Sequence, residues 1–230
     1  MLATPFRAVQ PHRRGASSGT RSAQESLSEG VAWAILRAVV PRLNITLAVK
    51  RLIRDVAARL PEFAHVRASR MLVVAGEARR ASRATIRPTR PSGRRNGPSV
   101  RVKGRTIFYV VSLRPLWFLE STPEERVATI LHELYHASTR FDGRLHRGRR
   151  HAVLPLGRYN RKIRALTHRY LAEAPTDVVA PFAHRGVVRA RMWLERPTGG
   201  VDPEGARRRV YTERQLFYGL VRMRTRGARR

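Results

Sequence analysis

The sequence predicts a domain that combines α-helices with short β-strands. Residues 44–60 and 122–136 repeat apolar side chains at the spacing of a buried helix face. Residues 71–74, 84–87 and 106–111 are instead short apolar runs, the last of them rich in β-branched and aromatic residues. The length of 230 residues is enough for one domain with a sizeable core and flanking segments.

Both predicted helices have recognisable ends. The first begins after Asn44, a suitable N-cap, and stops before Pro61. The second starts with the clearest local signal in the chain, because Thr122 is a natural N-cap and Pro123 suits the first helical position. Glu125, three residues after the threonine, completes a capping box.

The remaining segments are less regular. Residues 159–171 show helical spacing, and residues 186–195 again look like a strand. Residues 211–223 fit a strand or a helix. Residues 88–104 are rich in proline, glycine and basic side chains, so we expect a mobile loop there.

Composition divides the chain into three parts. Residues 1–24 contain arginines and serines but no acid, which predicts a disordered basic arm, although the same composition also resembles an organellar targeting segment. Residues 25–196 contain most of the helical and strand patterns and are the predicted folded domain. Residues 197–230 end in an arginine-rich stretch and are the predicted basic C-terminal extension.

Charge and cysteine content limit the partners and the chemistry. The formal net charge is +31, with 47 basic residues against 16 acids, so we expect attraction to polyanions and to DNA first. All basic residues except Lys50, Lys103 and Lys162 are arginines; this bias is typical of a GC-rich genome, but it does not explain the excess over acids. There is no cysteine, so any metal must be held by His, Asp or Glu.

The N-terminal third contains no predicted membrane span. Its longest apolar run, residues 31–40, includes Arg37 and is about ten residues long, whereas a span needs roughly 20. We therefore expect a cytoplasmic protein without a membrane partner.

The segment HELYH, at His132 to His136, carries the clearest chemical signal. Two histidines four residues apart project from the same face of a helix, so both imidazoles can reach one cation. Glu133 lies about 100° around the helix from His132, beside the metal but not bound to it. The pattern predicts a Zn²⁺ site with His132 and His136 as ligands and Glu133 as the general base that takes a proton from a zinc-bound water.

A third ligand is expected after this segment, and two histidines compete for the position. His146 follows His136 by ten residues and His151 follows it by fifteen. We favour His151, because the FDG turn at 141–143 and the arginine-rich stretch after it need room, and because a ligand just ahead of the next helix is anchored by an ordered element. Asp142 is either an acceptor for a ligand histidine or simply a turn former.

Residues 60–171 resemble bacterial and phage metallopeptidases that are similar to SprT-like zinc proteases, the group that includes the Spartan DNA–protein crosslink protease. The matching segments are PEFAHV at 61–66, ATILHELYHAS at 128–138, FDG at 141–143, a later histidine and RYLA at 169–172. The resemblance implies a minimal zincin-like α+β fold, with the HExxH helix packed on a small mixed β-sheet, three histidine ligands and a glutamate base. It also implies a third ligand shortly before the next helix, where His151 stands.

Two functions fit these features. The first is a zinc metallopeptidase acting on proteins or peptides, including proteins associated with DNA. The second is a nucleic-acid-binding protein whose zinc-stabilised core is catalytically weak or inactive. The intact Glu133 favours the enzyme, because a purely structural zinc site has no need of a carboxylate beside its metal.

Overall fold

A mixed β-sheet of five strands lies at the centre of the computed structural model, which describes residues 42–76, 82–89, 99–149, 153, 155–195, 197 and 210–223. The strands are β1 (Met71–Ala75), β2 (Ala84–Pro88), β5 (Tyr109–Leu113), β6 (Gly186–Trp193) and β8 (Leu216–Met223). Their order is β2-β5-β1-β6-β8. The central β1 runs parallel to β5 and β6, whereas β2 and β8 are antiparallel to their neighbours and form the two edges of this sheet.

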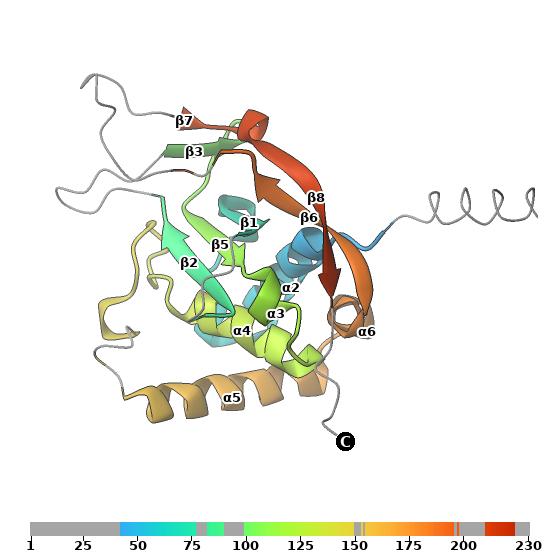
Figure 1. Ribbon diagram of the computed structural model, residues 1–230. Helices are drawn as coiled ribbons and strands as arrows, with labels where there is room; N and C mark the ends of the chain where they lie inside the picture. The colour runs from blue at the N-terminus through green and yellow to red at the C-terminus, as the bar shows by residue number, and fades with distance from the viewer. Residues whose placement is uncertain are drawn as a thin grey trace, which may run out of the picture. The chain divides into compact units, whose positions relative to one another are not determined.

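Three helices lie on one side of this sheet, the first two against the strands and the third packed on the second (Figure 1). They are α2 (Ile45–Arg59), α4 (Pro123–Tyr135) and α5 (Leu156–Glu173). Two short helices, α3 (Pro115–Phe118) and α6 (Thr176–Val179), lie in the connections. The predicted helix after Asn44 is confirmed, and the Asn44 side chain accepts a hydrogen bond from the backbone N–H of Leu47.

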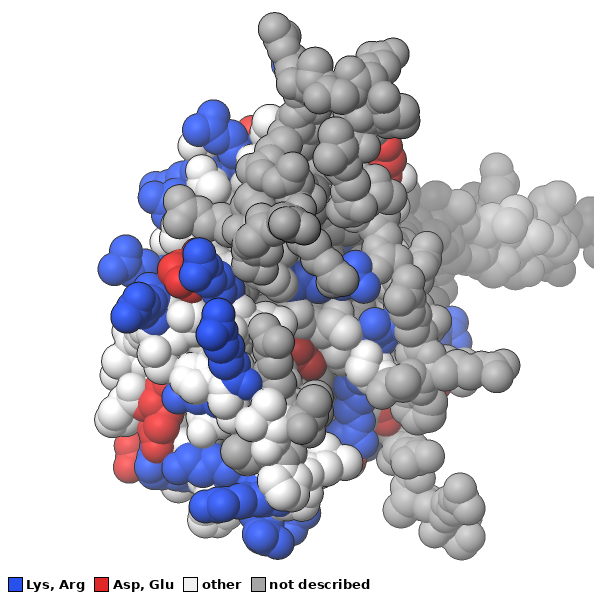
Figure 2. Space-filling model, turned by 90° about the vertical axis from the view of Figure 1, so that its left-hand side faces the viewer, with Lys and Arg blue, Asp and Glu red and all other residues white. Residues whose placement is uncertain are grey.

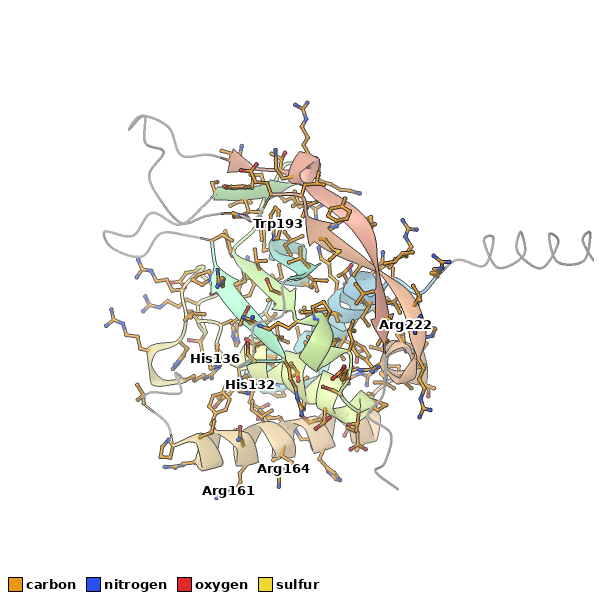
Figure 3. All side chains as sticks on the ribbon, viewed as in Figure 1. His132, His136, Arg161, Arg164, Trp193 and Arg222 are labelled. Atoms are coloured by element: carbon orange, nitrogen blue, oxygen red, sulfur yellow. The ribbon has the colours of Figure 1, made fainter. Side chains whose placement is uncertain are left out.

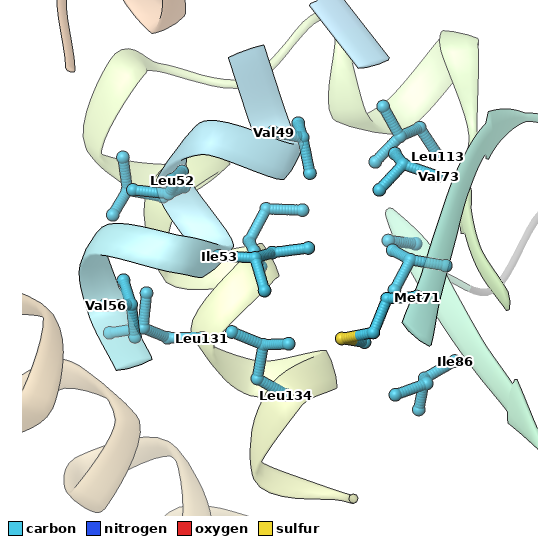
Figure 4. Packing of buried hydrophobic residues seen from close by; sticks show 14 of the residues in the cluster. Val49, Leu52, Ile53, Val56, Met71, Val73, Ile86, Leu113, Leu131 and Leu134 are labelled. Carbon is cyan, nitrogen blue, oxygen red and sulfur yellow. The ribbon is translucent and has the colours of Figure 1, made fainter. Parts of the chain in front are cut away.

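The main hydrophobic core lies between these helices and the sheet. Figure 4 shows Val49 and Ile53 of α2 facing Met71 and Val73 of β1, with Leu134 of α4 closing the cluster. Each of these five side chains is at most 3% exposed. Because α4 contributes to this core along its length, its apolar stripe fixes which way its polar side chains point.

The opposite face of the sheet is covered by a second, smaller sheet in the order β4-β3-β7. Its strands are β3 (Ser99–Val102), β4 (Arg105–Thr106) and β7 (Val210–Tyr211). The prediction of a loop throughout 88–104 is therefore wrong for β3, which pairs with β7 from a distant part of the chain. The strand alternative holds for 211–223, because β8 pairs with β6 along its whole length.

The described residues form an α+β fold with a mixed sheet, as predicted. They belong to one compact unit that begins at Arg42, and the predicted arm at 1–24 lies outside them. Strands β7 and β8 come from the segment 197–230, so part of the predicted C-terminal extension is built into the two sheets. Among the described residues, no helix combines the length and apolar character needed to cross a bilayer.

Candidate active site

Local sequence signals place the start of α4. The Thr122 side chain accepts a hydrogen bond from the backbone N–H of Glu125, and the Glu125 carboxylate accepts one from the N–H of Thr122, so the predicted capping box is confirmed. Val127, Ile130, Leu131 and Leu134 are buried on one face of the helix. With both its start and its buried face fixed, α4 presents His132, Glu133 and His136 in its last turn and at its C-cap.

The two motif histidines lie side by side. Their ring centroids are 5.1 Å apart, and the ring planes meet at 79°. His132 is half-buried and His136 is 8% exposed. Figure 3 shows both at α4, between β2 and α5 in that view. The structure thus brings together two of the three predicted zinc ligands.

A backbone carbonyl sets the tautomer of His136. Nδ1 lies 2.7 Å from the carbonyl oxygen of Arg149, and because a carbonyl only accepts, Nδ1 carries the proton, which in the neutral ring leaves the lone pair on Nε2. The Arg149 segment is held in place by its guanidinium, which lies 4.0 Å from the ring centroid of Tyr135 and donates to the Tyr135 carbonyl at 3.3 Å. The Nε2 lone pair is what a metal ligand requires.

Two roles were proposed for Asp142, and the contacts of its side chain are those of a turn former. Its Oδ1 accepts a hydrogen bond from the backbone N–H of Arg144 at 3.1 Å, within a turn where Phe141 and Gly143 have φ of 48° and 82°. The acceptor for Nδ1 of His136 is the Arg149 carbonyl. A backbone carbonyl leaves no mark in the amino-acid sequence, so sequence reasoning had no signal by which to find it.

Glu133 is a buried carboxylate at the same place. It is 8% exposed, and its Oε2 accepts a hydrogen bond from the backbone N–H of Ile86 in β2 at 2.7 Å. Burial raises the pKa of Glu133 to about 7, opposed by the Ile86 hydrogen bond and by the positive charge of Arg114. A carboxyl group with this pKa can accept and release a proton near neutral pH.

A groove of about 1390 Å³ gives access to these side chains. It is lined by the edge strand β2, by α4 and by α5, and His132, Glu133 and His136 all reach it. Leu145, Leu156, Ile163 and Leu171 give it an apolar wall. Arg83 and Glu125, which also line it, join β2 to α4 through an ion pair of 2.7 Å.

Only one of the two candidates for the third ligand, His146, is among the described residues. His151 lies outside the described residues, so its assignment stays a prediction. His146 is described: its backbone N–H donates to the His136 carbonyl at 2.8 Å, and its buried Nδ1 has no hydrogen-bond partner within the described part of the chain. His146 does not line the groove, and within the described ranges no three His, Asp or Glu side chains are grouped to hold a metal ion.

Tyr159 of α5 is a site residue that the sequence did not single out. It is fully buried, its ring contacts both motif histidines, and its pKa is raised by burial and by the charge of Glu133. Sequence spacing gives no means of selecting Tyr159 from the other tyrosines of the chain. The contact that distinguishes Tyr159 depends on how α5 packs against α4.

No family model matches the chain, and no curated protein or solved structure is detectably similar to it. The resemblance to SprT-like proteases therefore stays a prediction, and the functional inference depends on the site itself.

Proposed function

We propose that this protein is a zinc-dependent metallopeptidase. The observation that carries the proposal is the meeting of two imidazoles and a buried carboxylate of pKa about 7 in one groove. His132, His136 and His151 are the proposed ligands, and Glu133 is the proposed general base.

The described donors fit zinc. They are imidazoles on neighbouring turns, and with the proton on Nδ1 of His136, Nε2 is the nitrogen of that ring that would coordinate a metal. Zinc bound there would lower the pKa of a bound water to about 7 and polarise a substrate carbonyl.

Glu133 supplies the proton transfers. Its carboxylate takes the proton of the attacking water and later gives it to the leaving amine. The Ile86 N–H holds one carboxylate oxygen, Oε2, which orients the group toward the groove. The pKa of about 7 reflects the protein groups alone. A nearby cation would lower this pKa and so keep the base ionised at neutral pH.

The groove suits an extended peptide. Strand β2 is an edge of the sheet, and its residues from Ala84 to Ile86 line the groove. The N–H of Ile86 on this edge is already used by Glu133, so an extended chain would lie along the edge with its side chains on the apolar wall. This arrangement favours protein or peptide substrates.

The side of the molecule near this groove is basic. Figure 2 views the side where the segment after α4 and the start of α5 lie, and basic side chains cover more of its visible described surface than acidic ones. Arg158, Arg161 and Arg164 are exposed along α5. This charge favours substrates that are themselves associated with a polyanion.

A second surface supports DNA as a partner. Strand register places Arg189 and Arg191 of β6 on the same side as Tyr218, Leu220 and Arg222 of β8. We call these five residues the β6–β8 face. The two β6 guanidiniums lie 5.0 and 5.3 Å from the Tyr218 ring centroid. Tyr218 and Leu220 are 44% and 56% exposed, and Figure 3 labels Arg222 on this pair of strands.

The β6–β8 face has a surplus of positive charge. Among the described residues, the ion pairs with acids include none of its three arginines. The pKa of nearby Lys50 is lowered by burial and then by the charges of Arg191 and three further cations. Guanidiniums that bind phosphates beside an exposed aromatic ring are a combination found on nucleic-acid-binding surfaces. We propose that DNA binds here, and this surface would also serve the alternative function of a catalytically weak nucleic-acid-binding protein.

Metal analysis combined with a cleavage assay tests the peptidase. The purified chain should carry about one zinc, and cleavage of an unfolded protein should stop on chelation and return with Zn²⁺. A His132→Ala, His136→Ala double variant is the control and should lack both metal and activity. Equal zinc in the two proteins, or cleavage that is indifferent to chelation, would contradict the proposal.

A further inference from the structure

The ring of Tyr159 packs against both motif histidines, whose own ring centroids are 5.1 Å apart. Its centroid lies 4.8 Å from that of His132, edge to face, and 5.3 Å from that of His136, nearly parallel at 19°. The residue is 0% exposed, so α5 fixes the ring from the side opposite to α4. Neither imidazole can rotate freely while this ring is in place.

The Tyr159 hydroxyl has one proton and two neighbouring acceptors. It lies 3.1 Å from the carbonyl oxygen of His132 and 3.3 Å from Nε2 of His136. Because the second distance is at the long end of the hydrogen-bond range, the carbonyl is the better partner. The hydroxyl therefore stays hydrogen-bonded when the lone pair of Nε2 is used for coordination.

The end of α4 gives the first of these bonds a structural role. In a regular α-helix the N–H of His136 would donate to the carbonyl of His132, four residues earlier. Here it donates to the carbonyl of Glu133 at 3.2 Å, so the last turn is tighter than an α-helical one. The Tyr159 hydroxyl donates to the His132 carbonyl in its place. The spacing of the two imidazoles thus depends on a contact with α5 as well as on helix geometry.

Tyr159 does not reach the substrate side of the site. The described side chains that line the groove include both histidines and Glu133 but not Tyr159. Because it is fully buried and contacts both imidazole rings, Tyr159 is placed to position the histidines.

We propose that Tyr159 is a positioning residue that sets the separation and orientation of the two metal-binding imidazoles by capping the carbonyl of His132 and stacking on the ring of His136. This inference rests on the proposed function, since it assigns both histidines as zinc ligands. It adds a residue from α5 to a site whose described ligands all come from α4.

The chain offers a matched control for the hydroxyl. Tyr170 lies on the same helix, is 1% exposed, and donates to Oδ2 of Asp55 at 2.7 Å, with no contact to the histidines. Tyr159→Phe and Tyr170→Phe each remove one buried hydroxyl from α5. We expect the zinc dissociation constant, measured by chelator competition, to rise about tenfold in Tyr159→Phe and to stay unchanged in Tyr170→Phe.

A spectroscopic readout separates positioning from a general loss of stability. With Co²⁺ in place of zinc, the visible absorption bands report ligand geometry, and we expect them to shift in Tyr159→Phe only. Unchanged affinity and bands in Tyr159→Phe, or an equal affinity loss in Tyr170→Phe, would overturn the inference while leaving the peptidase proposal standing. If the unaltered chain binds no zinc, the proposed function fails, and this inference fails with it.

Discussion

At the scale of single residues, Glu133 combines a proposed chemical role with an energetic cost. Burial raises its pKa from 4.5 to about 7, so between these two values the folded chain holds a proton that the unfolded chain has lost. Stability rises with pH only where the unfolded state binds more protons, and here it binds fewer. The contribution of Glu133 to stability is therefore lost as pH rises from 4.5 to about 7.

Glu133→Gln should consequently stabilise the metal-free protein at pH 8. Glutamine keeps an acceptor for the Ile86 N–H but has no charge to desolvate, so the expected gain is on the order of 3 kcal/mol. The gain should vanish near pH 4, where the native carboxyl is protonated in both states. Urea unfolding in the presence of a chelator at both pH values measures this difference. A variant less stable than the unaltered chain at pH 8 would contradict the predicted burial cost.

The proposed third zinc ligand is also a question about single residues. His151→Ala should weaken zinc binding far more than His146→Ala, because the described His146 side chain does not line the groove that holds the other two histidines. Chelator competition on the two single variants gives the comparison. Release of metal by His146→Ala with retention by His151→Ala would reverse the assignment.

Residue identity predicts some of this site and leaves other parts unseen. The spacing of His132, Glu133 and His136 marks their common location, because a helix converts sequence spacing directly into geometry. The hydrogen-bond partners of His136, by contrast, are a backbone carbonyl and a tyrosine from the next helix. These contacts arise from chain reversal after α4, which no local pattern specifies.

At the scale of elements, the best predictions are those with local causes. Helices α2 and α4 begin at the expected caps, because side-chain capping of a helix N-terminus involves residues only a few positions apart. Strand β3 was missed although one partner, β4, is local: the two pair at the register Val102↔Arg105 across the positive-φ residues Lys103 and Gly104. The prolines, glycines and basic residues of 88–104 favoured a loop, and the other partner, β7, lies more than 100 residues further along the chain, at the register Val100↔Tyr211.

The capping box makes a measurable contribution to α4. Thr122→Ala should lower the free energy of unfolding by about 1 kcal/mol, because the N–H of Glu125 loses its acceptor at the helix N-terminus. Thr122→Ser retains the hydroxyl and is the matched control, with a near-native value expected. Urea unfolding of the three proteins makes the comparison. Equal stability of the alanine and serine variants would mean that the cap observed here contributes nothing.

At the scale of the whole molecule, charge and topology determine what the surfaces can bind. Composition predicts attraction to polyanions but does not say where, because a count of arginines carries no spatial information. The sheet order makes β2 an edge beside the groove. It places β8 at the opposite edge, where the β6–β8 face lies. Neither edge could be predicted from the strand patterns alone.

DNA binding should depend on the β6–β8 face and fall steeply with salt. Replacing its three arginines by glutamine should weaken binding of a fluorescent oligonucleotide and reduce the slope of log K against log salt by about 2 to 3, since each lost phosphate contact releases fewer counterions. A control of equal charge change replaces three arginines that are paired with acids: Arg51, Arg59 and Arg169. Equal weakening in both triple variants would mean that only net charge matters, and no binding at low salt would remove DNA as a partner.

The central proposal, a peptidase with Glu133 as its base, is tested most directly by single-turnover cleavage of an unfolded protein with zinc quantified in the same samples. Glu133→Gln should retain the zinc content of the unaltered chain and lose cleavage by about 100-fold or more, because it removes the proton acceptor without removing a ligand. Cleavage at the unaltered rate by a zinc-loaded Glu133→Gln variant would contradict the proposal, because another group would then have to accept the proton.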